Sequence, residues 1–266
     1  MSSSTLHEVK GPGLSVADGL CAVDIGATKT VVTYSAGGSL RVVERFPTDS
    51  DPQQAAHNVV TAARQVPNLK SLGIGCPGPL NPHTGVIVSP PNLKGWWGFA
   101  LADHLHRELG VPVAIENDAN LGALGEGAYG SAQRVGSLFY LTLSTGIGSG
   151  YIVDGRIVDG LGAIAGEVFA IDPGVFFGRP TGETLLELAS GPGLVRTALR
   201  RLASCRKSTL NPDSLDPPAL LAAADAGDAV AVEVVEASQN AVAGLLITVI
   251  CAVAPEVVVL AGGLCT

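Results

Sequence analysis

Residues 21–43 read CAVDIGATKTVVTYSAGGSLRVV, which is an apolar run, a turn of small residues, a second run, a glycine turn and a third run. The alternation of apolar and polar residues predicts three short β-strands. Residues 139–160, FYLTLSTGIGSGYIVDGRIVDG, repeat this plan. These residues alone leave two explanations open. Either the chain has two unrelated hairpin sheets, or it is a duplicated fold whose two glycine turns face each other across a cleft.

Other apolar segments surround the two sets of strands. Their spacing predicts strands over 71–76, 111–115 and 256–260, and helices over about 52–65, 99–109, 119–128, 183–189, 192–204 and 228–253. Strands and helices therefore alternate through much of the chain, and 34 glycines supply tight turns. This pattern predicts an α/β fold.

The turn that follows the first strand carries groups suited to phosphate. A glycine at position 26 lets backbone N–H groups approach phosphate oxygens, while Thr28 adds a hydroxyl donor and Lys29 a positive charge. Asp24 is an acceptor that suits Mg²⁺ through water. The turn of the second set offers small donors at Thr145 and Gly146. A plain β-turn remains the alternative for each turn taken alone, and the spacings of P-loop and dinucleotide-binding proteins are absent.

Residues 114–123, AIENDANLGA, place acids and amides at the end of an apolar run. A carboxylate within reach of a substrate hydroxyl can accept its proton, which makes Asp118 a candidate general base. Asp118 is equally suited to cap the helix expected from Ala119. The residues alone leave both roles open.

Composition limits the partners of the chain. The formal net charge of −8 repels phosphate backbones, so nucleic acid is not an expected partner. Five cysteines without a C-x-x-C pair indicate reduced thiols and a cytoplasmic location. Residues 1–19 lack the apolar core of a signal peptide and are expected to form a flexible leader. The longest apolar run, 241–254, is shorter than the roughly 20 residues of a membrane span, which favours a buried helix and no membrane partner.

Seven motifs follow one another from about residue 20 to the end of the chain. They are VDIGATKT, GIGCPGPLNPHTGVIVSPPNLKGW, IENDANLGALGE, LTLSTGIGSGYIVDG, AGE, LLELASG and VVVLAGG. Together they resemble the ROK family of sugar kinases and related repressors, within the actin–hexokinase group of folds. The resemblance implies two ribonuclease-H-like α/β domains that flank a cleft holding ATP and a sugar. We expect an N-terminal domain over 20–118 and a larger C-terminal domain over 119–266.

The resemblance also implies roles for individual residues. Asn117 and Asp118 match the family's sugar-holding pair, with the aspartate as the catalytic base. Glu167 and Glu187 match acids that bind sugar hydroxyls, and Asn92 matches a position near the cleft. The residues expected to hold ATP and its Mg²⁺ are Asp24, Gly26, Thr28, Lys29, Thr145, Gly146, Gly262 and Gly263.

The segment that binds structural zinc in the family is not matched. Ala170 stands at the histidine position, and the cysteine positions hold Gly178, Pro180 and Leu185. We therefore expect no zinc. We expect the loop at 170–186 to be ordered by two phenylalanines, Phe176 and Phe177, and two prolines. Because the missing histidine touches the sugar in the family, its loss leaves the identity of the hexose open.

Family members continue past the final glycine pair with helices that complete the adenosine pocket, whereas this sequence stops at Thr266. The strand at 256–260 and the long helix are therefore expected to leave apolar surface exposed. Exposed apolar patches promote association, so we expect a homodimer.

The leading expectation for function is a glucokinase-like enzyme that transfers the γ-phosphoryl group of ATP to a hydroxyl of a hexose, with Mg²⁺ on the phosphates. A sugar-responsive repressor of the same family would need a DNA-binding domain before the first glycine turn, and residues 1–19 are too short for one. A catalytically impaired sugar-binding protein is a third possibility, supported by Ala170. The retention of Asp118, Glu167 and both glycine turns argues against it.

Overall fold

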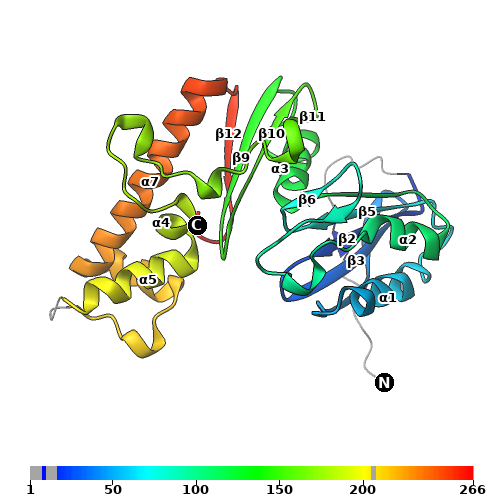
Figure 1. Ribbon diagram of the computed structural model, residues 1–266, viewed down its shortest axis with the longest axis horizontal. Coiled ribbons are helices and arrows are strands. Elements are labelled where there is room, and N and C mark those ends of the chain that lie inside the picture. Colours follow the sequence, from blue (N-terminus) through cyan, green and yellow to red (C-terminus); the bar gives the residue numbers. More distant parts are fainter. Residues whose placement is uncertain (1–7, 10–16, 205–207, 266) are drawn as a thin grey trace. The chain divides into compact units, whose positions relative to one another are not determined.

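The computed structural model describes residues 8–9, 17–204 and 208–265 of the chain. They form two compact units (Figure 1). Unit 1 holds the described residues up to Gln133 together with Asp159–Ala165, and unit 2 holds Arg134–Val158 and the chain from Gly166 onward. The division falls later than the boundary expected after residue 118, because the helix that starts there packs on strands of unit 1.

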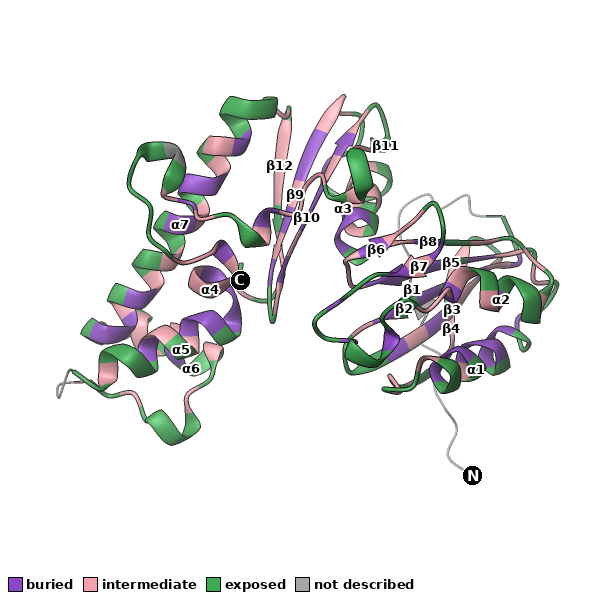
Figure 2. Cartoon of the chain, viewed as in Figure 1, coloured by how far each residue is buried: buried purple, intermediate pink, exposed green. Residues whose placement is uncertain are grey.

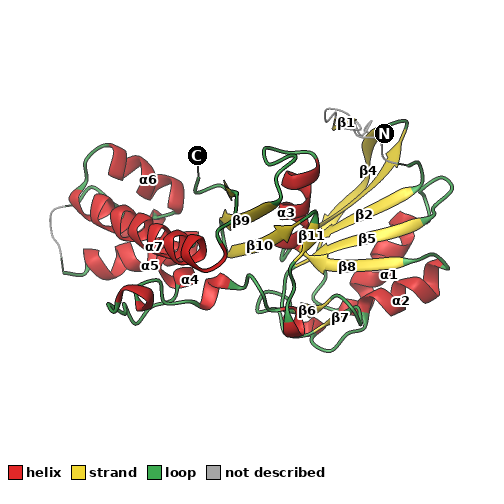
Figure 3. Cartoon of the chain, turned by 90° about the horizontal axis from the view of Figure 1, so that it is seen from above, coloured by secondary structure: helices red, strands yellow, loops and turns green. Residues whose placement is uncertain are grey.

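Unit 1 contains a six-stranded sheet in the order β1-β4-β3-β2-β5-β8 (Figure 3). The strands β2, β5 and β8 run parallel to one another, and the other neighbours are antiparallel. The bounds are β1 (Glu8–Val9), β2 (Leu20–Ile25), β3 (Lys29–Ala36), β4 (Ser39–Pro47), β5 (Ser71–Cys76) and β8 (Val113–Asn117), and a separate hairpin pairs β6 (Leu80–Asn81) with β7 (Val86–Ile87).

Part of the expected leader belongs to this sheet. β1 pairs with β4, which would otherwise present an unpaired edge of N–H and C=O groups to solvent. Asp18 also accepts a hydrogen bond from the N–H of Gly37 at 2.8 Å. The rest of the leader, residues 1–7 and 10–16, lies outside the described residues.

The core of unit 1 lies between this sheet and two helices. In β2 the side chains of Val23 and Ile25 are buried, whereas that of Asp24 points to the other face and is exposed. The buried face packs against α1 (Pro52–Ala63) and α2 (Leu101–Leu109) (Figures 2 and 3). Each fully buried Val, Leu or Ile contributes roughly 1.5–3 kcal/mol, so this layer supplies much of the stability of the unit.

Unit 2 combines a four-stranded sheet in the order β11-β10-β9-β12 with a layer of helices (Figure 1). The strands are β9 (Ser137–Leu143), β10 (Ile147–Val153), β11 (Arg156–Ile157) and β12 (Val257–Ala261). The helices are α4 (Leu185–Ala189), α5 (Gly191–Leu202), α6 (Pro217–Asp225) and α7 (Ala229–Val253). Short 3₁₀ helices occur in unit 2 at η3 (Val168–Ala170), η4 (Val175–Phe177) and η5 (Pro212–Ser214), and in unit 1 at η1 (Lys94–Trp96) and η2 (Leu161–Ala163).

The pairing of the strands supports a duplicated fold rather than two unrelated hairpins. In unit 1 the first long strand, β2, pairs antiparallel with the next strand and parallel with the later strand β5. In unit 2 β9 likewise pairs antiparallel with the next strand and parallel with the later strand β12. Two hairpins that arose separately would have no reason to share the parallel strand.

The helix α7 is longer than the apolar run that predicted it. It has 25 residues, and by length and composition alone it is the one helix in the described part of the chain that could cross a membrane. The length of the apolar run 241–254 is therefore no argument against a membrane span, because the helix that contains it is longer. One side of the helix packs inward, since Leu245 and Val249 are buried in one cluster with residues of β9 and α4. Only 22% of its most apolar 18-residue window is buried, so most of the helix is not covered by the described residues.

The far side of α7 and the strand β12 expose apolar side chains, as expected. Ile247, Ile250 and Val253 are 44–50% exposed, and Leu260 of β12 is 46% exposed. Apolar surface of this kind favours association, and the homodimer stays a prediction.

Asp228 fixes the start of α7 and the loop before it. Its buried carboxylate accepts hydrogen bonds from the N–H groups of Val230 and Ala231 and from Ser208 and Thr209. These donors, led by the Thr209 N–H, lower the pKa of Asp228 from 3.8 to about 2. The carboxylate therefore stabilises the fold fully above its ordinary pKa, and this contribution is lost as the pH falls toward 2.

We expect Asp228→Ala to lower the free energy of unfolding by about 2 kcal/mol at neutral pH, because it removes both a helix cap and the anchor of a loop. Asp228→Asn is the matched control, since Asn caps as well as Asp but carries no charge. Urea titrations at pH 7 and pH 3 measure both variants. A loss for Asp228→Ala no larger than that for Asp228→Asn would contradict the prediction.

Candidate active site

Acidic side chains gather where the parallel strands of unit 1 end. The strand register places Asp24, Gly75 and Glu116 side by side on β2, β5 and β8. Directly paired residues point to the same face of a sheet, which here is the face opposite α1 and α2. Helix α3 (Asp118–Ala128) lies over Gly75, because a Cβ there would approach the Leu121 side chain to 3.1 Å. The carboxyl ends of parallel strands are where open α/β sheets bind ligands.

The helix α3 is capped by Asn117 rather than by Asp118. Asn117 Oδ1 accepts the N–H groups of Ala119 at 2.8 Å and Asn120 at 3.3 Å. Asp118 is the first residue of the helix, and its Oδ1 also accepts the Ala119 N–H at 2.8 Å. The cap is therefore complete without Asp118, and its carboxylate need not be explained as a capping group.

The two aspartates at this edge influence each other. Burial raises the pKa of Asp118 above its ordinary value, and the negative charge of Asp24 raises it further, while the Ala119 N–H lowers it. Burial also raises the pKa of Asp24, which Lys29 opposes. Both side chains still reach solvent. Beside them lies the buried thiol of Cys76, whose pKa is raised to about 12, chiefly by burial and then by the two aspartates. This thiol stays protonated at any physiological pH.

In the first glycine turn, Gly26 closes the turn itself. Its N–H donates to the carbonyl of Lys29 at 2.9 Å, and a Cβ at Gly26 would come within 3.0 Å of that oxygen. The turn is also tied to Thr48, whose hydroxyl donates to the Gly26 carbonyl at 2.8 Å. Phosphate donors in this turn are therefore better sought in Thr28 and Lys29, both of which are exposed.

Asn92 lines a pocket of about 290 Å³ in unit 1 that also reaches this turn at Ala27. The pocket is braced by Trp96, whose buried ring donates Nε1–H to the carbonyl of Asp49 at 3.0 Å. Asp49 and Lys94 also line it, and neither was predicted as a site residue. Lys94 lies near the end of the motif GIGCPGPLNPHTGVIVSPPNLKGW. No sequence signal pointed to Asp49, because only the fold brings it beside that motif.

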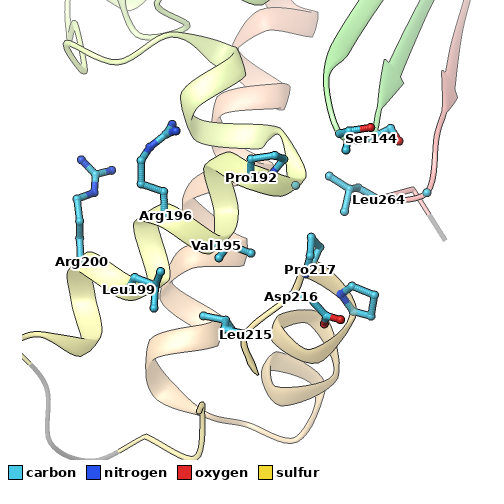
Figure 4. A pocket seen from close by; sticks show the side chains of 14 residues that line it. Ser144, Pro192, Val195, Arg196, Leu199, Arg200, Leu215, Asp216, Pro217 and Leu264 are labelled. Atoms are coloured by element: carbon cyan, nitrogen blue, oxygen red, sulfur yellow. The ribbon is translucent and has the colours of Figure 1, made fainter. Parts of the chain in front are cut away.

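Thr145 and Gly263 meet at a larger pocket in unit 2 of about 840 Å³ (Figure 4). The side chains of Val195, Leu199 and Leu215 form apolar walls (Figure 4). The pocket has the size and apolar lining typical of sites for cofactors. Its lining residues on α5 and at the start of α6 were missed, because an apolar helix face gives the same sequence signal whether it lines a pocket or a core. They include Pro192, Val195, Arg196, Leu199, Arg200, Leu215 and Pro217.

The two glycines that end the last strand of unit 2 differ. Gly262 has φ +96°, and a Cβ there would overlap the backbone of Leu143. Gly263 has open space at its Cβ position and lines the large pocket. Gly146, in the second turn, also has open space at that position.

The two predicted sugar-binding glutamates lie in separate short elements of unit 2. Glu167 precedes η3, in a turn supported by a hydrogen bond from Ser149 Oγ to the carbonyl of Gly166. Glu187 takes part in a capping box of α4, where its Oε2 accepts the N–H and the hydroxyl of Thr184 at 2.8 and 2.9 Å. These bonds lower the pKa of Glu187, so the carboxylate is charged.

The loop expected to be ordered by phenylalanines is organised by Asp172. Its carboxylate accepts the N–H groups of Gly174, Thr181 and Gly182 and the Thr181 hydroxyl at 2.8–3.1 Å. Phe177 is 48% exposed. The side chain of Phe176 lies outside the described residues, so an ordering role for the two phenylalanines stays a prediction. No cluster of three or more metal-ligating side chains occurs among the residues described. The absence of zinc stays a prediction, which elemental analysis of the purified protein measures.

The fold is a mixed α/β fold of the actin–hexokinase type, as expected. The solved ROK hexokinase from Thermus thermophilus matches 92% of this chain and 82% of its own at 32% identity and a TM-score of 0.77. A ROK glucokinase from Streptomyces griseus, solved with glucose and AMPPNP, matches 92% of this chain and 83% of its own at 26% identity and a TM-score of 0.71.

The sequence comparisons define the family. The family model described as ROK matches residues 20–266, so the chain belongs to the ROK family. A glucokinase from Halalkalibacterium halodurans is 34% identical over 205 residues, which are 74% of this chain and 62% of that enzyme. A xylose repressor from Caldicellulosiruptor bescii is 38% identical over 110 residues, which are 41% of this chain and 27% of the repressor. The chain thus matches less than two thirds of the length of each of these relatives.

Proposed function

We propose that this protein is a glucokinase-like sugar kinase that transfers the γ-phosphoryl group of ATP to a hydroxyl of a hexose. The observation that carries the proposal is Asp118, a carboxylate at the carboxyl edge of the parallel strands that the helix cap does not require. The glucokinase relative and the glucose complex of the Streptomyces griseus enzyme support a hexose as the acceptor. The proposal implies a cytoplasmic location, where ATP is available.

Asp118 would act as the general base. A sugar hydroxyl that attacks a phosphoryl group must lose its proton, and a carboxylate within hydrogen-bond reach accepts it. Burial and the charge of Asp24 raise the pKa of Asp118, which makes it a stronger base than a fully solvated aspartate. Because a base must be deprotonated, turnover should fall as the pH drops through this raised pKa.

The large pocket of unit 2 would hold the nucleotide. Its apolar walls on α5 and α6 suit the flat face of a base, and Thr145 and Gly263 at its rim suit the phosphates. AMPPNP in the Streptomyces griseus relative supports ATP as the donor. In unit 1, the exposed hydroxyl of Thr28 and the charge of Lys29 are themselves suited to bind phosphate oxygens.

Mg²⁺ would be held by Asp24. Two carboxylates whose pKa values are both raised, and which repel each other, favour a divalent cation nearby. Mg²⁺ is usually bound by one or two carboxylates together with substrate phosphates. When bound, it neutralises charge that develops on the transferred phosphoryl group.

The hexose would be held by amide and carboxylate groups. Asn117 uses Oδ1 for the helix cap, which leaves its Nδ2 to donate to a sugar hydroxyl. Glu187 binds Thr184 through Oε2, which leaves Oε1 as an acceptor. The family resemblance gives Glu167 and Asn92 a sugar-binding role as well.

The test is a coupled assay of the purified chain with ATP and Mg²⁺ against glucose, fructose, mannose and N-acetylmannosamine. The proposal expects turnover with at least one of them, and a kcat lowered by roughly 10²–10⁴-fold in the Asp118→Asn variant under the same conditions. The similarity to a xylose repressor gives the alternative of a sugar-responsive regulator. Binding of a sugar by calorimetry without any turnover would support that alternative and overturn the kinase.

A further inference from the structure

A second carboxylate stands next to the proposed base, and it is used within the protein. Glu116 Oε1 accepts the backbone N–H of Asn117 at 2.8 Å and the Nδ2–H of Asn120 at 3.0 Å. One oxygen thus binds the last residue of β8 and the side chain of the third residue of α3. It bridges the strand and the helix on either side of Asp118.

The buried side chain of Asn120 has an unpaired oxygen, and its hydrogen bond to Glu116 explains why a polar residue occupies this position. Its side chain is only 8% exposed, and its Oδ1 is the one buried side-chain oxygen or nitrogen, among the residues described, that has no hydrogen-bond partner. A buried amide with an unpaired carbonyl is unfavourable, and an apolar residue would avoid the penalty. The amide cannot be turned around, because its oxygen would then face the carboxylate of Glu116. The hydrogen bond from Asn120 Nδ2 to Glu116 therefore offsets part of the free energy lost by leaving Oδ1 unpaired.

Two hydrogen-bonded links fix the turn between β8 and α3. Glu116 binds the Asn117 N–H and Asn120 from the strand side, while Asn117 Oδ1 binds the first N–H groups of the helix. Asp118 lies between the linked residues, so its backbone direction is set by both. General-base catalysis depends on such precision, since a misplacement of about 1 Å can cost 10²-fold in rate.

We infer that Glu116 and Asn120 are positioning residues, which hold the β8–α3 turn so that the Asp118 carboxylate points at the reacting hydroxyl. This inference rests on the proposed kinase function, in which Asp118 is the base. Glu116 acts through the lone pairs of one oxygen and not through its charge. A glutamine at position 116 therefore fulfils the same role, and an alanine does not.

The test compares Glu116→Ala, Asn120→Ala and Glu116→Gln with the parent chain. We expect the two alanine variants to lower kcat by about 10- to 100-fold with KM for the sugar changed less than threefold. Glu116→Gln should retain kcat within about threefold, because its amide oxygen can accept both hydrogen bonds. Full kcat in Glu116→Ala, or an equal loss in Glu116→Gln, would overturn the inference.

A matched control separates positioning from general loss of stability. Glu126 Oε2 accepts the N–H and hydroxyl of Ser131 at 2.8 Å, which is the same kind of clamp at the opposite end of α3. Glu126→Ala should lower the melting temperature but not kcat, measured well below that temperature. A fall in kcat that matches the fall for Glu116→Ala would show that any weakening of α3 has this effect, and would count against positioning.

The amide protons distinguish failure of this inference from failure of the kinase proposal. Hydrogen exchange followed by NMR should show faster exchange of the Asn117 N–H in Glu116→Ala, and parent-like exchange in Glu116→Gln and Glu126→Ala. If the parent chain phosphorylates no sugar, the kinase proposal fails, but the exchange data still test whether Glu116 fixes the β8–α3 turn. An unchanged Asn117 exchange rate in Glu116→Ala would overturn the inference about Glu116, whatever the activity.

Discussion

Asp118→Asn is expected to lower kcat by roughly 10²–10⁴-fold, which corresponds to about 3–5 kcal/mol of activation free energy. The substitution keeps the size of the side chain and an oxygen that can accept the Ala119 N–H. It removes only the group that accepts the proton. Sugar affinity should survive, because Asn117, Glu167 and Glu187 are unchanged.

The stability of the same variant gives an independent reading. The raised pKa of Asp118 means that the folded state holds a proton more tightly than the unfolded state, so the charged carboxylate destabilises the fold as pH rises through this range. Asp118→Asn should therefore melt at the parent temperature or above it. A capping role would predict near-parent turnover, but the cap belongs to Asn117. Near-parent turnover would refute the catalytic assignment.

Asp103→Asn is the control for this experiment. Asp103 is an exposed residue of α2 in the same unit, where it pairs with Arg107 at 3.2 Å across one helical turn. Such surface pairs contribute little to stability. The turnover and the melting temperature of the Asp103→Asn variant should both match those of the parent. The acid limb of the pH–rate profile should also be unchanged in this variant.

The fold was predictable because its signals are local. The alternating runs of β2, β3, β9 and β10 contain the period-two pattern of half-buried strands, and the order of seven motifs fixed the family. The first and last residues of individual strands were predicted less well. The strand expected over 111–115 is β8, Val113–Asn117, because Pro112 cannot donate to the ladder and the polar Glu116 and Asn117 continue the pairing with β5.

Residues of the candidate site were predictable only where a family motif assigns a role to a particular position. Asp118 and Thr145 follow from such motifs, whereas Glu116 was seen in the sequence but given no separate role. Its function depends on Asn120 lying one helical turn away, which only the start of α3 defines. The anchor of the 172–182 loop was missed for a related reason. Asp172 binds Thr181 and Gly182, nine and ten residues later, and no local pattern marks such a pair.

The two neighbouring glycines at the end of β12 give the second large effect. Gly262→Ala is expected to lower the free energy of unfolding by roughly 2–5 kcal/mol, since it combines a positive φ with steric overlap. The new Cβ would lie 2.2 Å from the Leu143 carbonyl oxygen and 2.7 Å from its carbon. Relief requires that β12 or the end of β9 move, and the end of β9 leads into the turn at Ser144 and Thr145.

Gly263→Ala should behave in the opposite way. No atom lies within 4 Å of its Cβ position, and its φ lies outside the left-handed region, so stability should stay within about 1 kcal/mol of the parent. The added methyl group enters the large pocket of unit 2, so nucleotide affinity should fall several-fold.

Gly227→Ala is the control for backbone strain, because Gly227 has φ +84° in the same unit with open space around it. Urea unfolding and binding of AMPPNP by calorimetry measure the three variants. If Gly262→Ala costs no more stability than Gly227→Ala, the close approach to Leu143 does not hold β12 against β9. If Gly263→Ala binds AMPPNP as the parent does, the pocket at this glycine is not the nucleotide site.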